Sequence, residues 1–102
     1  MIRALSRSAD LAPFRTLVEP LVEHDRARGS DLVKTLRTYF ATGANASEAA
    51  DRLFLHRNSM AYRLERAGKL TGLDLREPKA ALALQLGLLV LKEEEKHEAE
   101  HP

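Results

Sequence analysis

Apolar residues recur at helical spacing along the chain, and most interruptions of this pattern fall at a proline or a glycine. The first periodic stretch, about residues 10–18, carries four apolar residues on one face: Leu11, Phe14, Leu17 and Val18. Pro20 predicts a break, because proline disfavours a helical residue before it and suits the first turn of a new helix. A second short helix should then end at about Arg28, before Gly29. Residues 1–29 are therefore predicted to form N-terminal lead-in helices.

A third helical stretch follows, and Ser30 or Asp31 can cap its start. Its inward face is predicted to contain four residues: Leu32, Leu36, Tyr39 and Phe40. Lys34 and Arg37 are predicted to face outward, and Gly43 is predicted to end the helix.

Two further helices are predicted to be joined by a tight connection over residues 54–57. Asn45 and Ser47 are both residue types that cap a helix, and the first helix turns three residues inward: Ala49, Ala50 and Leu53. The second helix, about residues 58–70, has a core stripe of four residues: Met60, Leu64, Ala67 and Leu70. A steep crossing of two helices requires a small residue at the crossing and apolar residues around the turn. Ala50 meets the first requirement and Leu55, with its apolar neighbours, the second, so the pattern predicts a helix-turn-helix.

The 3.6-residue period then places Ser59, Arg63 and Arg66 on the outward face of the second helix. Arginine can bind guanine and asparagine can bind adenine through two hydrogen bonds, while hydroxyl groups and helix N-terminal amides can hold phosphate. Arg52 on the first helix is placed to lie near the DNA backbone, and His56 either caps the second helix or contacts a phosphate. The candidate DNA contacts are Arg52, His56, Arg57, Asn58, Ser59, Tyr62, Arg63 and Arg66.

On spacing alone, these residues could also have a purely structural role without DNA contact. A basic helix face is often only solvated, and Tyr62, beside the core stripe, can be half buried with its hydroxyl at the rim.

The last predicted helix, about residues 79–91, is apolar on two sides. One stripe is predicted to pack on the domain: Leu82, Leu86 and Leu89. A second stripe finds no evident partner within so short a chain: Ala81, Leu84, Leu88 and Leu91. A helix with two apolar faces is either central to a core or part of an interface, so we expect a homodimer through this helix. Residues 92–102 form an acidic tail, which we interpret as an extension of the helix or as disorder.

The motif HRN, followed by YRL and LTG, is the most distinctive part of the sequence. With its flanks, residues 49–86, it resembles the C-terminal helix-turn-helix domain of the PucR family of bacterial transcription regulators. The residues that match are Ala50, Leu53, His56, Arg57, Asn58, Tyr62, Arg63, Leu64, Leu70, Thr71, Gly72 and Pro78. The preceding segment is similar through Pro20, Leu21, Asp25, Leu32, Thr35, Leu36 and Tyr39. The resemblance covers about residues 17–91. It departs from the family pattern at Ala61, where a basic residue is frequent, and at Ala67, where the apolar residue is usually larger.

The resemblance implies a Fis-like all-α fold and sequence-specific DNA binding, with a recognition helix of about residues 58–70 in the major groove. Family members usually carry a large N-terminal sensory region, so the chain is expected to be a domain of a longer regulator or a stand-alone member. The predicted domains are the lead-in helices over 1–29, the helix-turn-helix domain over 30–91 and the acidic tail over 92–102. Dimerisation would fit the paired half-sites that such proteins commonly bind. The alternative is a helical interaction module that has lost DNA binding.

Charge refines this picture, because the formal net charge of +1 over 102 residues hides an uneven distribution. Residues 92–102 contain five Glu and two Lys, a net charge of −3, so the remainder carries +4. Residues 45–70 contain five basic and three acidic residues. The candidate DNA-binding segment is therefore basic within a nearly neutral chain.

Other classes of protein find little support. The absence of cysteine excludes disulfide scaffolds and Cys-ligated zinc, and no apolar run reaches the roughly 18 residues of a membrane span. We therefore expect no membrane association, a cytoplasmic location, no enzymatic activity and no cofactor. The segment from His97 to His101 fits the zinc motif HExxH, but it lies in a polar tail without a third ligand or a cleft, so chance metal binding is the most we expect from it.

Overall fold

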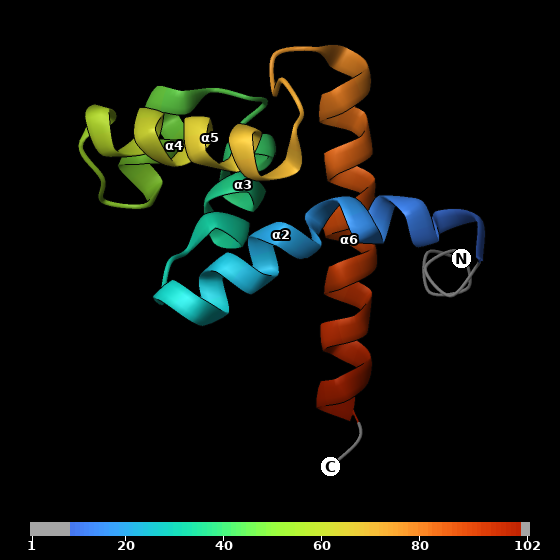
Figure 1. Cartoon of the computed structure of the whole chain (residues 1–102). Helices are drawn as coiled ribbons and strands as arrows, with labels where there is room; N and C mark the ends of the chain where they lie inside the picture. The colour runs from blue at the N-terminus through green and yellow to red at the C-terminus, as the bar shows by residue number, and fades with distance from the viewer. Residues whose placement is uncertain (1–8, 101–102) are drawn as a thin grey trace.

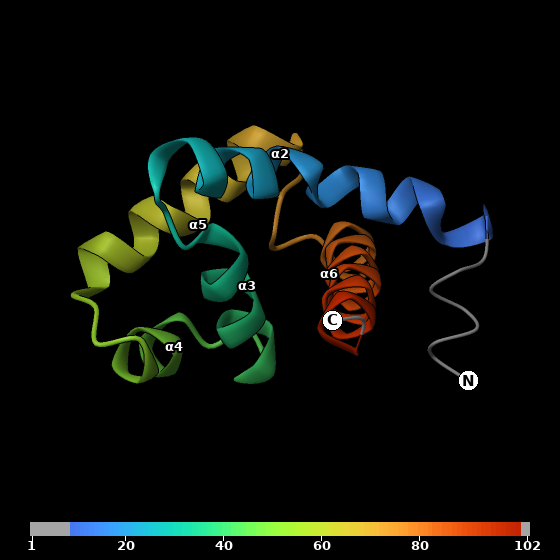
Figure 2. The same ribbon diagram turned by 90° about the horizontal axis from the view of Figure 1, so that it is seen from below.

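The computed structural model describes residues 9–100, and over this range the chain is all-α, as predicted, with no strand. The elements are η1 (Ala9–Leu11), α2 (Ala12–Arg28), α3 (Leu32–Ala41), α4 (Ala46–Arg52), α5 (Arg57–Thr71) and α6 (Pro78–Glu100). Helix α2 crosses the long helix α6, and α3, α4 and α5 gather on one side of this crossing (Figure 1). The turned view shows α3 between the α4–α5 pair and α6 (Figure 2).

Two groups of buried residues hold the helices together. The larger group joins α2, α3, α5 and α6 and includes Leu21, Leu36 and Leu84, which are fully buried. The smaller group lies beneath the helix-turn-helix and consists of Tyr39, Ala49, Ala50 and Met60. Phe40 of α3 packs against both groups. The predicted inward residues of α3, α4 and α5 are thus confirmed, and α3 links the two groups.

The predicted break at Pro20 is wrong, because α2 continues through it from Ala12 to Arg28. A proline inside a helix removes a backbone hydrogen bond and crowds the carbonyl one turn earlier, at a cost of about 3 kcal/mol. Val18 and Leu21 lie on either side of Pro20 and are both fully buried. Burial of two such side chains contributes roughly 3–6 kcal/mol. This gain outweighs the cost of the proline and keeps the helix continuous.

The two apolar stripes of α6 are exchanged relative to the prediction. Leu84, Leu88 and Leu91 are buried in the larger group, whereas Leu82 and Leu89 are 58% and 43% exposed. The stripe that was expected to lack a partner therefore packs within the domain, and it is not available for a dimer interface.

Gly87 explains this orientation of α6, because it shares the buried face with Leu84, Leu88 and Leu91. A Cβ at this position would overlap the carbonyl oxygen of Phe14 and lie 2.9 Å from the Cγ1 of Val18. The missing side chain lets the backbone of α2 lie directly against α6, which leucine spacing alone does not indicate.

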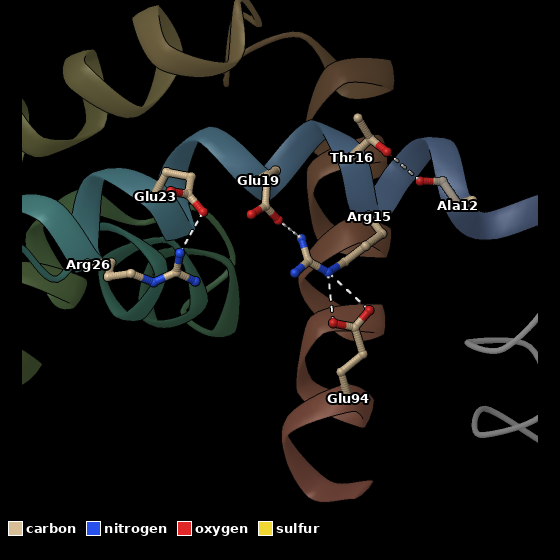
Figure 3. A network of polar contacts seen from close by, with 7 residues as sticks. All are labelled: Ala12, Arg15, Thr16, Glu19, Glu23, Arg26 and Glu94. Carbon is tan, nitrogen blue, oxygen red and sulfur yellow. Dashed lines mark hydrogen bonds and ion pairs between the residues drawn. The ribbon is translucent and has the colours of Figure 1, made fainter. Parts of the chain in front are cut away.

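Ion pairs hold the polar end of α6 against α2 and α3. The Nε of Arg15 donates to both carboxylate oxygens of Glu94, at 2.9 and 3.0 Å, and its Nη1 donates to Glu19 at 2.7 Å (Figure 3). The hydrogen bond from Arg15 holds the pKa of the Glu19 carboxyl below its ordinary value. Arg37 of α3 donates to Glu95 at 3.1 Å. The prediction that Arg37 faces outward is therefore wrong, and the segment after residue 91 extends α6 as an attached helix.

A carboxylate from the preceding helix caps α3. Asp31 holds the N-cap position, but its side chain makes no capping hydrogen bond. Asp25 of α2 instead accepts hydrogen bonds from the backbone N–H groups of Leu32, at 2.8 Å, and Val33, at 3.1 Å, and from the Ser30 hydroxyl at 2.5 Å. The predicted side-chain cap from Ser30 or Asp31 is thus replaced by Asp25, which fixes the start of α3 relative to α2.

Replacing Gly87 with alanine should destabilise the fold, although alanine is the better helix former by about 1 kcal/mol. The added Cβ forces α2 and α6 apart, and overpacking of this kind costs about 1–3 kcal/mol. Urea denaturation measures the free energy of unfolding. Gln85→Ala, at an exposed position of α6, is the control and should change it by less than about 0.5 kcal/mol. Unchanged or raised stability for Gly87→Ala would contradict the close approach of the two helices.

Asp25→Ala should lower the free energy of unfolding by about 1–3 kcal/mol, because two backbone N–H groups and a hydroxyl lose a charged acceptor. Asp31→Ala is the matched control, since it removes the same charge from the start of α3 without removing a capping hydrogen bond. Thermal and urea unfolding of both variants make the comparison. Equal losses would mean that the acidic charge near the helix start matters and that the hydrogen bonds of Asp25 do not.

Candidate nucleic-acid interface

Helices α4 and α5 form the predicted helix-turn-helix, and local hydrogen bonds set its geometry. The side chain of Asn45 caps α4 by accepting a hydrogen bond from the Glu48 N–H at 3.0 Å. In the turn after α4, Phe54 adopts a left-handed backbone conformation with φ of 56°, and its side chain is 96% exposed. The N–H of Leu55 then donates to the carbonyl of Ala50 at 2.9 Å. The turn thus folds back on α4 and directs α5 across it.

His56 caps the start of α5. Its Nδ1 accepts a hydrogen bond from the backbone N–H of Asn58 at 3.1 Å. An imidazole nitrogen accepts a hydrogen bond only while it carries no proton, so this cap requires the neutral ring in the tautomer that carries its proton on Nε2. Of the two roles expected for His56, capping is the one that the structure contains.

Most of the candidate contacts gather in one shallow groove along the first half of α5. Five of them line it: Asn58, Ser59, Tyr62, Arg63 and Arg66. Tyr62 is 61% exposed, so the half-buried alternative does not describe it. The Arg66 guanidinium carbon lies 5.9 Å from the centre of the Tyr62 ring, and its Nη2 donates to the Tyr62 hydroxyl at 3.3 Å. These two side chains form a cation–π pair on the outer face of the helix.

Arg63 lies differently from its predicted neighbours. It is half buried, and its Nη1 donates to the hydroxyl of Thr35 on α3 at 3.1 Å. Thr35 is buried, and its own hydroxyl donates to the carbonyl of Asp31 at 2.6 Å. Arg63 therefore lines the same groove as its predicted neighbours but is more buried than they are. The residue lies at the edge of the core stripe, and a buried hydroxyl on α3 attracts its guanidinium inward.

The remaining arginines lie outside this groove. Arg57 is exposed and lines the neighbouring groove between α4 and α5 together with Ala61. Arg52 pairs with Glu48 at 3.1 Å and lines a groove of α3 and α6, where none of the other candidates lies. The structure therefore groups the candidates on α5 and separates Arg52 from them.

Two polar residues of the groove were not predicted. His24 of α2 and Ser30 of the α2–α3 turn line it, and the His24 Nδ1 lies 2.8 Å from the Ser30 hydroxyl oxygen. They are about 30 positions away from α5 in the sequence, so no local motif could have connected them to it. The capping propensity of Ser30 was the one signal that marked this turn.

The exposed face of α5 also carries an ion pair. Glu65 pairs with Lys69 on the same face at 3.1 Å, which leaves the arginines near the start of the helix as its positive part.

Within the described residues, no cluster of three or more His, Cys, Asp or Glu side chains could hold a metal ion. His101, the last residue of the HExxH pattern, lies outside the described residues. None of the described helices is long and apolar enough to cross a membrane.

Comparisons with known proteins identify the family to which the chain is similar. A family model described as the PucR C-terminal helix-turn-helix domain matches residues 32–90. The purine catabolism regulatory protein of Bacillus subtilis is 34% identical over 79 residues, which are 78% of this chain and 15% of that protein. The proline-responsive transcriptional activator PutR of the same species is 31% identical over 68 residues, which are 67% of this chain and 16% of that protein.

An uncharacterized protein of Haemophilus influenzae is 34% identical over 74 residues, which are 72% of this chain and 20% of that protein. The matched part is thus a small fraction of each of these longer relatives. No solved structure matches the chain significantly. The family match covers α3, α4, α5 and the first part of α6, and so includes the helix-turn-helix built from α4 and α5. The chain belongs to the PucR C-terminal helix-turn-helix domain family.

Proposed function

We propose that the chain binds double-stranded DNA sequence-specifically and that α5 enters the major groove. The observation that carries this proposal is the set of exposed hydrogen-bonding side chains along the first half of α5, on the outer side of a helix-turn-helix. In this motif the N-terminal residues of the second helix contact base edges, while the first helix crosses the DNA backbone. The family match supports the same conclusion.

The proposed base contacts are those that the structure leaves exposed at the start of α5. Asn58 can bind adenine, and Arg57 can bind guanine, each through two hydrogen bonds. Ser59 and Tyr62 offer hydroxyl groups for phosphate or base edges. Arg66, held on the Tyr62 ring, presents its guanidinium with part of its freedom already lost, so less entropy is lost on binding.

Arg63 has a different proposed role. Its hydrogen bond to Thr35 ties α5 to α3, so it fixes the angle at which the recognition helix leaves the domain. His56, as the cap, fixes the first turn of α5 in the same way. We propose that both act mainly by positioning the exposed residues. Arg52 keeps its proposed phosphate contact, at the end of the first helix of the motif.

Transcription regulation follows as the proposed role, because two relatives carry the names of a purine catabolism regulatory protein and a proline-responsive transcriptional activator. Such a role would place the chain on DNA in the bacterial cytoplasm. The homodimer stays a prediction, and the face of α6 that it would have to use is the exposed one that carries Leu82.

The first test is a titration with mixed-sequence duplex DNA at two salt concentrations, followed by selection of bound sequences from a random pool. Affinity should fall with a log–log slope of about −0.9 for each phosphate contact. The selected pool should converge on a preferred half-site. Absence of binding at about 50 mM salt would reject the DNA proposal and leave the alternative of an interaction module.

Asn58→Ala and Arg66→Ala should each lower the affinity for the selected site by about 1–3 kcal/mol, or roughly 5–150-fold, because each removes a proposed base contact. Neither should change the free energy of unfolding by more than about 0.5 kcal/mol, since both side chains are exposed. Lys79→Ala, an exposed cation at the start of α6, is the charge-matched control for Arg66→Ala and should leave affinity nearly unchanged. An equal loss for Lys79→Ala would show that overall charge governs binding.

Arg63→Ala and Thr35→Val should show coupled effects on stability. A double-mutant cycle by urea denaturation should give a coupling energy of about 1 kcal/mol, because the two side chains share one hydrogen bond. Arg66→Ala combined with Thr35→Val is the control pair and should be additive. Additive effects for Arg63 and Thr35 would contradict the positioning role of Arg63.

A further inference from the structure

A second open groove lies between α3, the end of α4 and α6, on a part of the surface that has no residue in common with the grooves lined by α5. Its volume of about 700 Å³ is in the range of ligand-binding pockets. Four large apolar side chains form its floor: Phe40, Leu53, Leu88 and Leu89. Leu89 remains 43% exposed in the groove, so part of its apolar surface is open to a ligand. Among the residues that line this groove, Arg52 alone has a role in the proposed DNA contact.

Cations surround this apolar floor. Four basic side chains line the groove: Lys34, Arg37, Arg52 and Lys92. No carboxylate among the described residues lines it. Glu95 and Glu48, outside the groove, each pair with one of its arginines at 3.1 Å. Within the described range, neither lysine forms an ion pair. The groove therefore combines an apolar floor with a positive rim.

One donor in this region is incompletely satisfied. The Nε of Arg37 is buried and has no hydrogen-bond partner, and it is the sole buried side-chain polar atom of this kind within the described part of the chain. Its Nη2 donates a hydrogen bond to Glu95, whereas its Nε donates none. A buried unsatisfied donor is costly and calls for an explanation.

We propose that this groove binds an acidic amphipathic helix of a partner protein. The partner's apolar residues, spaced at i, i+4 and i+7, would enter the floor beside Leu89, and flanking carboxylates would pair with the cations of the rim. The apolar floor argues against a nucleic acid, which would bring charged phosphates to leucine and phenylalanine side chains. The groove shares only Arg52 with the proposed DNA contact, so a partner could occupy its apolar floor while α5 contacts DNA.

The probe is a designed 18-residue helical peptide with leucines at i, i+4 and i+7 and glutamates beside them, labelled for fluorescence anisotropy. A second peptide has the same leucines and lysines in place of the glutamates. The full chain should bind the acidic peptide saturably and at least about tenfold more tightly than the basic one, because rim charges select between them. Equal binding of the two peptides, or no saturable binding of the acidic one up to about 1 mM, would overturn the proposal.

Two leucines of α6 offer a matched pair of variants. Leu89→Glu places a charge in the groove and should weaken acidic-peptide binding at least about tenfold. Leu82→Glu changes a still more exposed leucine of the same helix that does not line the groove, and it should alter binding less than about twofold. Lys34→Glu against Lys79→Glu repeats the comparison for charge at exposed positions where folding is not at risk. Equal effects within either pair would overturn the groove as the binding site.

The same variants distinguish a partner helix from other possible occupants of the groove. Sedimentation equilibrium that finds a dimer broken by Leu89→Glu and kept by Leu82→Glu would show that a second copy fills the groove, and it would overturn the partner helix. Competition between the acidic peptide and a short DNA duplex would assign the groove to nucleic acid and overturn the proposal as well. Unchanged peptide affinity in the presence of saturating DNA is the result expected. The peptide assay needs no DNA, so its result is independent of the proposed DNA binding.

Discussion

The close crossing of α2 and α6 at Gly87 is the contact on which the rest of the domain depends. It buries Val18 of α2 against α6, and it also buries the face of α6 that carries Leu84. Helix α2, fixed in this way, supplies Asp25 to the first turn of α3. Helix α3 then carries Thr35, which holds Arg63 on α5. The orientation of the exposed face of α5 is thus set by a contact at the other side of the domain, through a series of direct hydrogen bonds and packing contacts.

The helix-turn-helix was predictable from the sequence because its determinants are local. The Asn45 cap acts over three residues, and Ala50 and Leu55 meet across one turn of chain. Most of the features that the sequence did not predict depend on distant segments, although the Asp25 cap of α3 acts over seven residues. Pro20 remains inside α2 because α6 buries its neighbours, and Arg37 turns toward α6 because Glu95, 58 positions further on, lies beside it. Periodicity identifies an apolar face of a helix without identifying what covers it.

The same difference between local and distant determinants explains which parts of the candidate site the sequence predicted. Helical spacing placed Ser59, Arg63 and Arg66 on one face, and the angle was approximately right for all three. Arg63 lies at the boundary of that face, where its orientation is decided by whether a polar partner exists on the adjoining helix. Thr35 is that partner, and sequence spacing contains no information about it. His24 and Ser30 entered the groove for a similar reason, because the α2–α3 turn is brought to α5 by packing alone.

The location of the acidic residues resolves the conflict between a nearly neutral chain and a DNA partner. The glutamates of residues 92–100 lie on the last part of α6, and two of them are held by Arg15 and Arg37. Figure 1 places this end of α6 opposite to α5. Glu93, the first of these glutamates, lies 15 residues from the start of α6, or about 22 Å along the helix, which is between two and three Debye lengths at physiological salt. Repulsion between these carboxylates and DNA bound at α5 would therefore be screened, and the charge that governs association is the local charge of α5 and its neighbours.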